Sequence, residues 1–292
     1  MDVAVIGLIE DEDILLDLAS LALSQLDHGR DIARYLDMLE EIEDRVCHEG
    51  RSALLPEERA AALSRVLHGE LGFVGDADGY DAPVNADFIR VLDRRRGLPI
   101  ALSILYVAMA RRAGWTAHVL NLPGNVLVQM GEENPVVIDP FAGGRLVSQR
   151  QIAALCRACL GEEGDASALS AVRMSNRDVL ARLLNNQAVR AEKENDPRRA
   201  LAVYRRITRI APGVLDAWQN RSRLQLAFDD VAGARASLLA MAEVAPDRQT
   251  RERIMDAFEA LDPTGPVSPY PSSPFDRDPG EKAWLCRRFL QF

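Results

Sequence analysis

The feature that most constrains this fold is an internal repeat in the last third of the chain. Equivalent residues recur 34 positions apart: Asn186 with Asn220, Leu184 with Trp218, Ala200 with Ala234, and Ala211-Pro212 with Ala245-Pro246. A repeat of this length cannot bury its apolar face alone, so neighbouring copies must stack on one another. We therefore predict stacked helix pairs in this part of the chain.

A period of 34 residues is typical of the tetratricopeptide helix-turn-helix. We predict that residues 170–262 form an all-α domain of such repeats, whose concave surface binds a protein partner. Residues 263–292 follow as a tail rich in proline and serine, which ends in the apolar and basic stretch WLCRRFLQF. This tail packs on its own repeats in one interpretation, and contacts a second subunit or a partner in the other.

The first 160 residues show a different pattern, in which helices precede strands. Apolar side chains at three- and four-residue spacing predict two amphipathic helices between Asp11 and Cys47, then helices over 56–69, 86–95 and 99–113. Strand-like segments follow at 116–120, 125–130 and 135–138, separated by turns that contain glycine or asparagine. We expect an α+β fold: a helical region over 1–62, then a core over 63–160 with a buried helix against an antiparallel sheet.

Charge and cysteine content limit the partners and the compartment. The formal net charge of −9 argues against a nucleic-acid or anionic-membrane surface. The start of the chain has no basic segment typical of an export signal, and the apolar run from Leu98 to Ala110 is shorter than the roughly 20 residues of a membrane span. Four cysteines in 292 residues are too few for a disulfide scaffold. We expect a soluble, cytoplasmic protein.

Four short motifs lie on or beside the predicted core helix and strands. They contain Tyr80, Pro83 and Asn85; Arg95, Arg96, Gly97, Pro99, Leu102 and Ser103; Pro123 and Gly124; and Ile138, Asp139, Pro140 and Phe141. Together these motifs resemble the SirB family of bacterial proteins, over roughly Leu63 to Pro246. The resemblance implies a transglutaminase-like (papain-like) core followed by tetratricopeptide repeats.

Transglutaminase-like enzymes use a cysteine thiolate at a helix start, a histidine on a neighbouring strand and an acid that orients the histidine. The resemblance places these positions at Pro99, Asn125 and Asp139. The family itself lacks the cysteine, and its Pro-Gly-His motif is Pro-Gly-Asn in this chain. An amide cannot accept a proton at neutral pH, and a lone aspartate after a strand is typical of a turn or cap. We therefore predict a degenerate triad and a protein that is not an enzyme.

A relocated nucleophile is the alternative, and it would make the protein a hydrolase or acyltransferase. Ser103 lies one turn inside the core helix, where helix packing is the competing role. Cys156 and Cys159 are spaced like a redox or zinc pair, but their helical context favours buried apolar side chains. His118 is the candidate relocated base. The histidines show no metal-ligand spacing, so we predict no metal or cofactor.

The sequence favours a regulatory module that binds a protein or peptide. Its expected contact surface consists of the loops 80–85 and 122–125 with neighbouring polar residues, and the candidates are Tyr80, Asn85, Arg96, Asn125 and Asp139. The cluster Arg94–Arg96 could bind an anion, although a solvated face or an ion pair with Asp81 or Asp87 competes with this interpretation. A scaffold that only oligomerises through its tail is the third hypothesis.

Overall fold

The structure is a computed structural model that describes residues 3–29, 31–122, 124–160 and 172–261. The chain divides into two compact units, Met1–Arg190 and Ala191–Phe292. The predicted tail over 263–292 lies outside the described residues, and so does the stretch 161–168, whose composition predicts a linker between the core and the repeats. Among the described helices, none is both long enough and apolar enough to cross a membrane.

Helices make up the first part of the chain, as the apolar spacing predicts. They are α1 (Val3–Leu8), the 3₁₀ turn η1 (Asp11–Asp13), α2 (Leu16–His28), α3 (Ala33–Glu49), α4 (Pro56–Ser64) and the π-helical turn η2 (Arg65–Glu70). α3 buries four apolar side chains at three- and four-residue spacing, Tyr35, Leu39, Ile42 and Val46. α1 was not predicted, because its six residues are too short to display a helical period.

Two helices and a short parallel strand pair follow. The elements are β1 (Val74–Gly75), the 3₁₀ turn η3 (Pro83–Ala86), α5 (Phe88–Arg94), β2 (Arg96–Gly97) and α6 (Pro99–Arg112). Asp87 caps α5 by accepting a hydrogen bond from the Arg90 amide at 3.0 Å, and Arg95 ends the helix in a left-handed conformation with φ 56°. Pro99 occupies the first turn of α6, as predicted, and every residue of α6 from Ile100 to Ala110 is buried.

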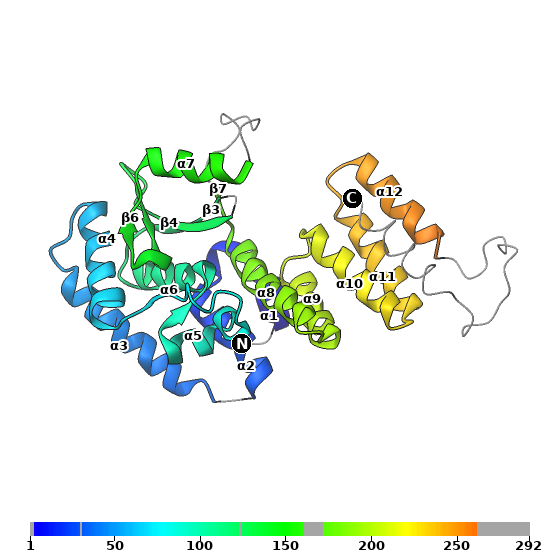
Figure 1. Cartoon of the computed structure of the whole chain (residues 1–292), viewed down its shortest axis with the longest axis horizontal. Coiled ribbons are helices and arrows are strands. Elements are labelled where there is room, and N and C mark those ends of the chain that lie inside the picture. The colour runs from blue at the N-terminus through cyan, green and yellow to red at the C-terminus, as the bar shows by residue number, and fades with distance from the viewer. Residues whose placement is uncertain (1–2, 30, 123, 161–171, 262–292) are drawn as a thin grey trace, which may run out of the picture. The chain divides into compact units, whose positions relative to one another are not determined.

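A five-stranded antiparallel sheet lies between two helices (Figure 1). Its strands are β3 (Ala117–Leu122), β4 (Asn125–Met130), β5 (Val136–Asp139), β6 (Arg145–Leu146) and β7 (Val172–Arg173), in the order β6-β5-β4-β3-β7. α7 (Gln149–Leu160) covers one face, where Ile152 and Cys156 pack with Leu120 and Leu127. α6 covers the opposite face. This arrangement confirms the predicted α+β core.

The helical repeat is also confirmed. The helices after the sheet are α8 (Asn176–Lys193), α9 (Pro197–Ile210), α10 (Leu215–Ala227), α11 (Val231–Glu243) and α12 (Arg248–Glu259). The 34-residue offset reappears in their geometry, since Asp196 caps α9 and Asp230 caps α11. Ala200 and Ala234 are both fully buried. Small residues at these two positions therefore serve packing inside each repeat.

The boundary between the two units differs from the one expected near residue 170. α8 lies almost wholly in the first unit, which ends at Arg190. The reason is a set of contacts that the repeat pattern does not encode. The Asn176 amide donates to Asp11 at 2.8 Å, and Gln187 donates to the carbonyl oxygen of Ala86 at 2.9 Å. The first repeat helix thus packs with the α+β core.

Candidate functional site

The predicted nucleophile position lies at the first residue of α6. Pro99 stands in the first turn, and Leu98 precedes it in an extended conformation with φ −71° and ψ 158°. A thiolate at such a helix start would be stabilised by the helix dipole. The four cysteines of the chain are at other positions. The start of α6 therefore has suitable backbone geometry but carries no nucleophilic side chain.

The predicted base position, Asn125, begins β4 and is half-buried. Asn125 pairs with Leu122, and Leu127, two residues further along, lies in the apolar cluster beneath α7. Side chains two positions apart in a strand point to the same face, so the register places Asn125 on the face covered by α7. α6 covers the opposite face (Figure 1). The register therefore separates Asn125 from the helix that begins at Pro99.

Asp139, the third predicted triad position, ends β5 and caps the 3₁₀ turn η4 (Pro140–Ala142). Its Oδ1 accepts hydrogen bonds from the amides of Phe141 at 2.9 Å and Ala142 at 3.3 Å. Burial raises the pKa of the Asp139 carboxyl, while the two amides and Arg145 oppose the shift. These contacts are those of a capping residue.

Two hydroxyl groups on α6 are enclosed in the core. Ser103 and Tyr106 are fully buried, and neither hydroxyl has a hydrogen-bond partner in the part of the chain that the structure describes. Burial, and to a smaller extent the charge of Asp139, raises the pKa of Tyr106. An enclosed serine with no base on its hydroxyl lacks the environment of an activated nucleophile.

The other candidate nucleophiles and bases lie apart from α6. His118 Nε2 is 2.9 Å from Glu132 Oε1, and Glu132 also pairs with Arg173 at 2.6 Å. Cys156 is buried in the apolar cluster under α7, and the Cys159 side chain lies outside the described residues. No group of three or more metal-ligating side chains occurs among the described residues.

The loop before α5 is held by a network centred on Arg94. Arg94 donates to Asp76 at 2.8 Å and to Asn85 at 2.6 Å, and Asn85 donates to the carbonyl oxygen of Gly79 at 2.7 Å. The hydrogen bond from Arg94 is the main cause that lowers the pKa of Asp76. Because both ends of the loop are tied to α5, the backbone that carries Tyr80 has a defined conformation.

This network corrects two expectations. Arg94 does not pair with Asp81 or Asp87, because the parallel pairing of β1 with β2 brings Asp76 beside it instead. Asn85 is fully buried, so its side chain supports the loop from within and is absent from the exposed surface. Tyr80, by contrast, is 45% exposed.

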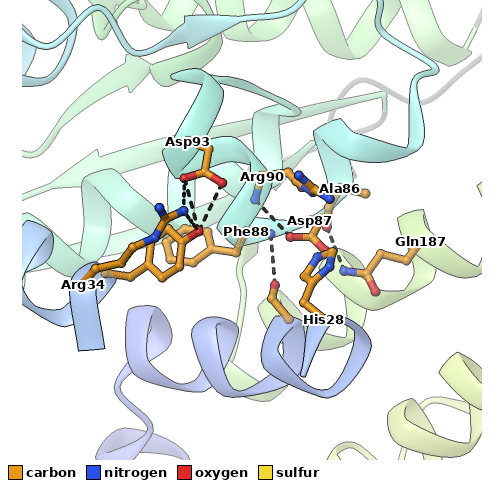
Figure 2. Close-up of polar contacts among 10 residues, drawn as sticks. His28, Arg34, Ala86, Asp87, Phe88, Arg90, Asp93 and Gln187 are labelled. Atoms are coloured by element: carbon orange, nitrogen blue, oxygen red, sulfur yellow. Dashed lines mark hydrogen bonds and ion pairs between the residues drawn. The ribbon is translucent and has the colours of Figure 1, made fainter. Parts of the chain in front are cut away.

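Contacts from two distant helices hold α5 from below and from the side (Figure 2). His28, the last residue of α2, places Nε2 2.6 Å from Oδ2 of Asp87. Gln187 of α8 reaches the carbonyl oxygen of Ala86, and Ser24 accepts a hydrogen bond from the amide of Phe88 at 3.2 Å. The loop with Tyr80 is therefore attached to a fixed frame of α2, α5 and α8.

Two arginines of α8 were missed by the sequence analysis, and one of them, Arg190, contacts Tyr80. Arg190 donates to the Tyr80 carbonyl oxygen at 2.9 Å, and its guanidinium carbon lies 5.9 Å from the centre of the Tyr80 ring. Arg182 donates to Asn121 of β3. The available signal was their spacing, since Arg182, Asn186 and Arg190 recur every four residues on one helix face.

The predicted site residues therefore separate into groups. Tyr80 lies beside Arg190 of α8, and Phe141, which follows the Asp139 cap, meets Tyr80 edge-on with ring centres 5.9 Å apart. Arg96 is exposed on β2. A surface pocket beside the start of α7 contains none of the predicted site residues, and its lining is Pro135, Val136, Val137, Leu146, Val147, Ser148, Gln149 and Gln151.

Comparison with known proteins agrees with this architecture. A protein of Xylella fastidiosa (strain 9a5c), called UPF0162 protein, is 31% identical over 192 residues, which cover 64% of this chain and 68% of that protein. The UPF0162 protein of Vibrio cholerae is 31% identical over 38% of this chain and 43% of its own length. Human F-box only protein 21 is 28% identical over 43% of this chain and 20% of its own length.

A crystal structure of menin, described as revealing the binding site for the Mixed Lineage Leukemia (MLL) protein, covers 87% of this chain and 72% of its own. The TM-score is 0.40 and the identity 13%, which is too remote to bear on function. Residues 188–259 match the tetratricopeptide repeat, and residues 33–185, more than half of the chain, match the transglutaminase-like superfamily. The chain belongs to the transglutaminase-like superfamily and carries C-terminal tetratricopeptide repeats.

Proposed function

We propose that this chain is a non-catalytic, cytoplasmic transglutaminase-like protein that acts as a regulatory module by binding a protein or peptide. The observation that carries the proposal is the chemistry at two positions of the core. Pro99 begins α6 where the enzymes need a thiolate, and Asn125 begins β4 where they need a proton acceptor. The resemblance of the motifs to the SirB family supports the same interpretation.

The environment of the cysteines and serines supports the absence of catalysis. Cys47 is exposed, and partial desolvation of its thiol, together with the neighbouring Glu43 and Asp44, raises its pKa, which is the opposite of an activated thiol. Cys156 and Ser103 are buried among apolar groups. A relocated nucleophile would need an accessible group beside a base, and these three groups lack that combination.

The rigid setting of Tyr80 supports a binding role. An exposed aromatic ring on a loop with a buried hydrogen-bond network keeps its position at low entropic cost when a partner arrives. Tetratricopeptide repeats commonly mediate protein–protein contacts, so the second unit offers a further surface for the same partner. We therefore place the first contact of the partner at Tyr80.

A peptide-display selection on the full chain tests this function. We expect enriched peptides that bind the wild-type protein and lose affinity at least tenfold for Tyr80→Ala, with an unchanged melting temperature. Arg34→Ala, which removes an exposed arginine of α3, is the matched control and should bind normally. Failure to enrich any peptide would count against the binding role.

The same preparations test the enzyme alternative. Iodoacetamide alkylation of each cysteine, resolved by peptide mapping, should show no thiol that reacts fast below pH 8. Hydrolysis of p-nitrophenyl acetate should stay at the rate of the buffer. A turnover that one cysteine or serine substitution abolishes would overturn the non-catalytic proposal and favour a hydrolase or acyltransferase.

A further inference from the structure

The polar face of α9 carries only positive charge. Its sequence, PRRALAVYRRITRI, contains five arginines and no acidic residue. Because successive residues of an α-helix are about 100° apart, all five arginines lie within an arc of about 120°, and the buried Ala200 and Ile207 lie on the opposite side. The arginines extend over about 16 Å of the helix axis. We call this surface the arginine stripe, and its members are Arg198, Arg199, Arg205, Arg206 and Arg209.

This arrangement of charges is unfavourable for the helix by itself. Arg198 and Arg199 stand in the first turn of α9, where the helix dipole disfavours cations. Arg205 and Arg209 are four residues apart, so their side chains are neighbours on the helix surface and repel one another. In α12, by contrast, Arg248 pairs at 2.6 Å with the glutamate four residues later. An anionic partner would relieve the repulsion along α9.

Three arginines of the stripe keep their donors available. Arg198, Arg205 and Arg209 are exposed, and their guanidinium groups form no ion pair or hydrogen bond within the described part of the chain. The Arg198 guanidinium carbon lies 6.0 Å from the centre of the Phe228 ring, at the end of α10. An aromatic face orients a guanidinium without using its N–H groups. These N–H groups can therefore donate to a ligand.

Arg221 of α10 continues the positive charge beside the stripe. Its Nη1 donates to Oγ1 of Thr208 at 2.9 Å, and this hydroxyl donates to the carbonyl oxygen of Arg205, one turn earlier in α9, at 3.1 Å. The Arg221 guanidinium carbon also lies 5.1 Å from the centre of the Trp218 ring. Burial, and then the charge of Arg205, lowers the pKa of Arg221, while Asp230 opposes the shift. The two helices thus form one basic surface.

We propose that the arginine stripe, continued by Arg221, binds an acidic segment of a protein partner. The inference rests on the proposed function and adds a second contact surface and the chemical class of its ligand. Each planar guanidinium can bind a carboxylate through two parallel hydrogen bonds. The net charge of −9 repels a long polyanion such as a nucleic acid, which extends beyond the stripe, whereas a short acidic segment ends within it.

The probe for the first experiment is a capped, fluorescent peptide of about 15 residues, in which glutamate recurs every third or fourth residue among alanines. The control peptide has glutamine in place of each glutamate. Both are titrated with the full chain and followed by fluorescence anisotropy. We expect saturable binding of the glutamate peptide, weakened by added salt, and none of the glutamine peptide. Equal binding of both peptides, or no binding of either, would overturn the proposal.

Variants with the same change in net charge assign the binding to α9. The double variant Arg205→Gln, Arg209→Gln removes two exposed charges and keeps good helix formers, so it should fold normally and weaken glutamate-peptide binding about fivefold or more. The matched control is Arg248→Gln, Arg251→Gln, which removes two exposed arginines of α12 and should leave binding nearly unchanged. An equal loss in both double variants would show an effect of net charge alone and overturn the proposal.

Other anions test the assignment to a protein partner. A single-stranded oligonucleotide and vesicles that contain phosphatidylserine should both bind more weakly than the glutamate peptide at the same salt concentration. If either binds more tightly, and the Arg205→Gln, Arg209→Gln variant loses that binding, the stripe recognises a polyanion of that kind and the proposal is wrong.

Peptides from the display selection separate this inference from the proposed function. Selected acidic peptides that bind the Arg205→Gln, Arg209→Gln variant as tightly as the wild type would leave the function intact and contradict the stripe. Stripe-dependent binding of the glutamate peptide, in a protein for which the selection enriches nothing, would support the stripe and count against the binding role of Tyr80.

Discussion

Arg112 joins three helices of the first unit and provides the sharpest test of what holds it together. From the last turn of α6, its Nε donates to Asp17 of α2 and its Nη1 donates to Glu43 of α3, both at 2.7 Å. The Asp17 side chain is only 4% exposed, whereas that of Arg112 is 25% exposed. Replacing Arg112 with methionine keeps the aliphatic stem and leaves the Asp17 carboxylate buried without its cation.

The size of the effect follows from these exposures. Removing one partner of a buried ion pair costs about 3–5 kcal/mol. Water can reach the quarter-exposed end of Arg112 and partly solvate Asp17, so we expect a loss of about 2–3 kcal/mol in the free energy of unfolding. For a unit of this size that loss corresponds to roughly 5–10 °C in melting temperature.

Urea unfolding followed by circular dichroism measures the change, and amide hydrogen exchange in α6 assigns it to the first unit. Adding Asp17→Asn to Arg112→Met should recover part of the loss, because a neutral amide needs no counter-charge. Arg34→Met is the matched control, since Arg34 is 63% exposed in its pair with Asp93 and should cost less than about 1 kcal/mol. An Arg112→Met effect no larger than that control, or a double variant with no recovery, would refute the reasoning.

Three further outcomes are expected. Asn85→Ala removes both hydrogen bonds of a buried amide and should lower the unfolding free energy by about 1–3 kcal/mol in urea titrations. Hydrogen bonds from Arg173 and, to a smaller extent, from His118 lower the pKa of Glu132 below its usual value of 4.5. The ionised Glu132 therefore stabilises the fold above that pH, and this stabilisation should be lost in more acidic buffer. The loss should be smaller in Glu132→Gln, which has no carboxylate to protonate. Burial raises the pKa of Asp139 from 3.8, so its ionisation opposes folding, and the melting temperature of Asp139→Asn relative to wild type should increase from pH 4 to 7.

Much of the candidate site depended on contacts that no local pattern contains. The sequence identified Tyr80 as a candidate contact residue on a loop, and it grouped Asn85 with Tyr80. The Asn85 side chain is buried, however, and supports the loop from within. The role of Arg190 was hidden because the repeat pattern accounts for α8 as a packing helix. Its bond to Tyr80 spans 110 residues and arises only when α8 packs against the core.

What the sequence determined by itself was local and periodic. The 34-residue offset predicts the helix pairs of the repeats, and the apolar spacing predicts α6, because helix periodicity involves residues a few positions apart. The tertiary structure alone decided that Asn125 faces α7 and that Arg190 bonds to Tyr80. The first depends on strand register and the second on the packing of α8 against the loop before α5, and both are set by contacts between segments distant in the chain.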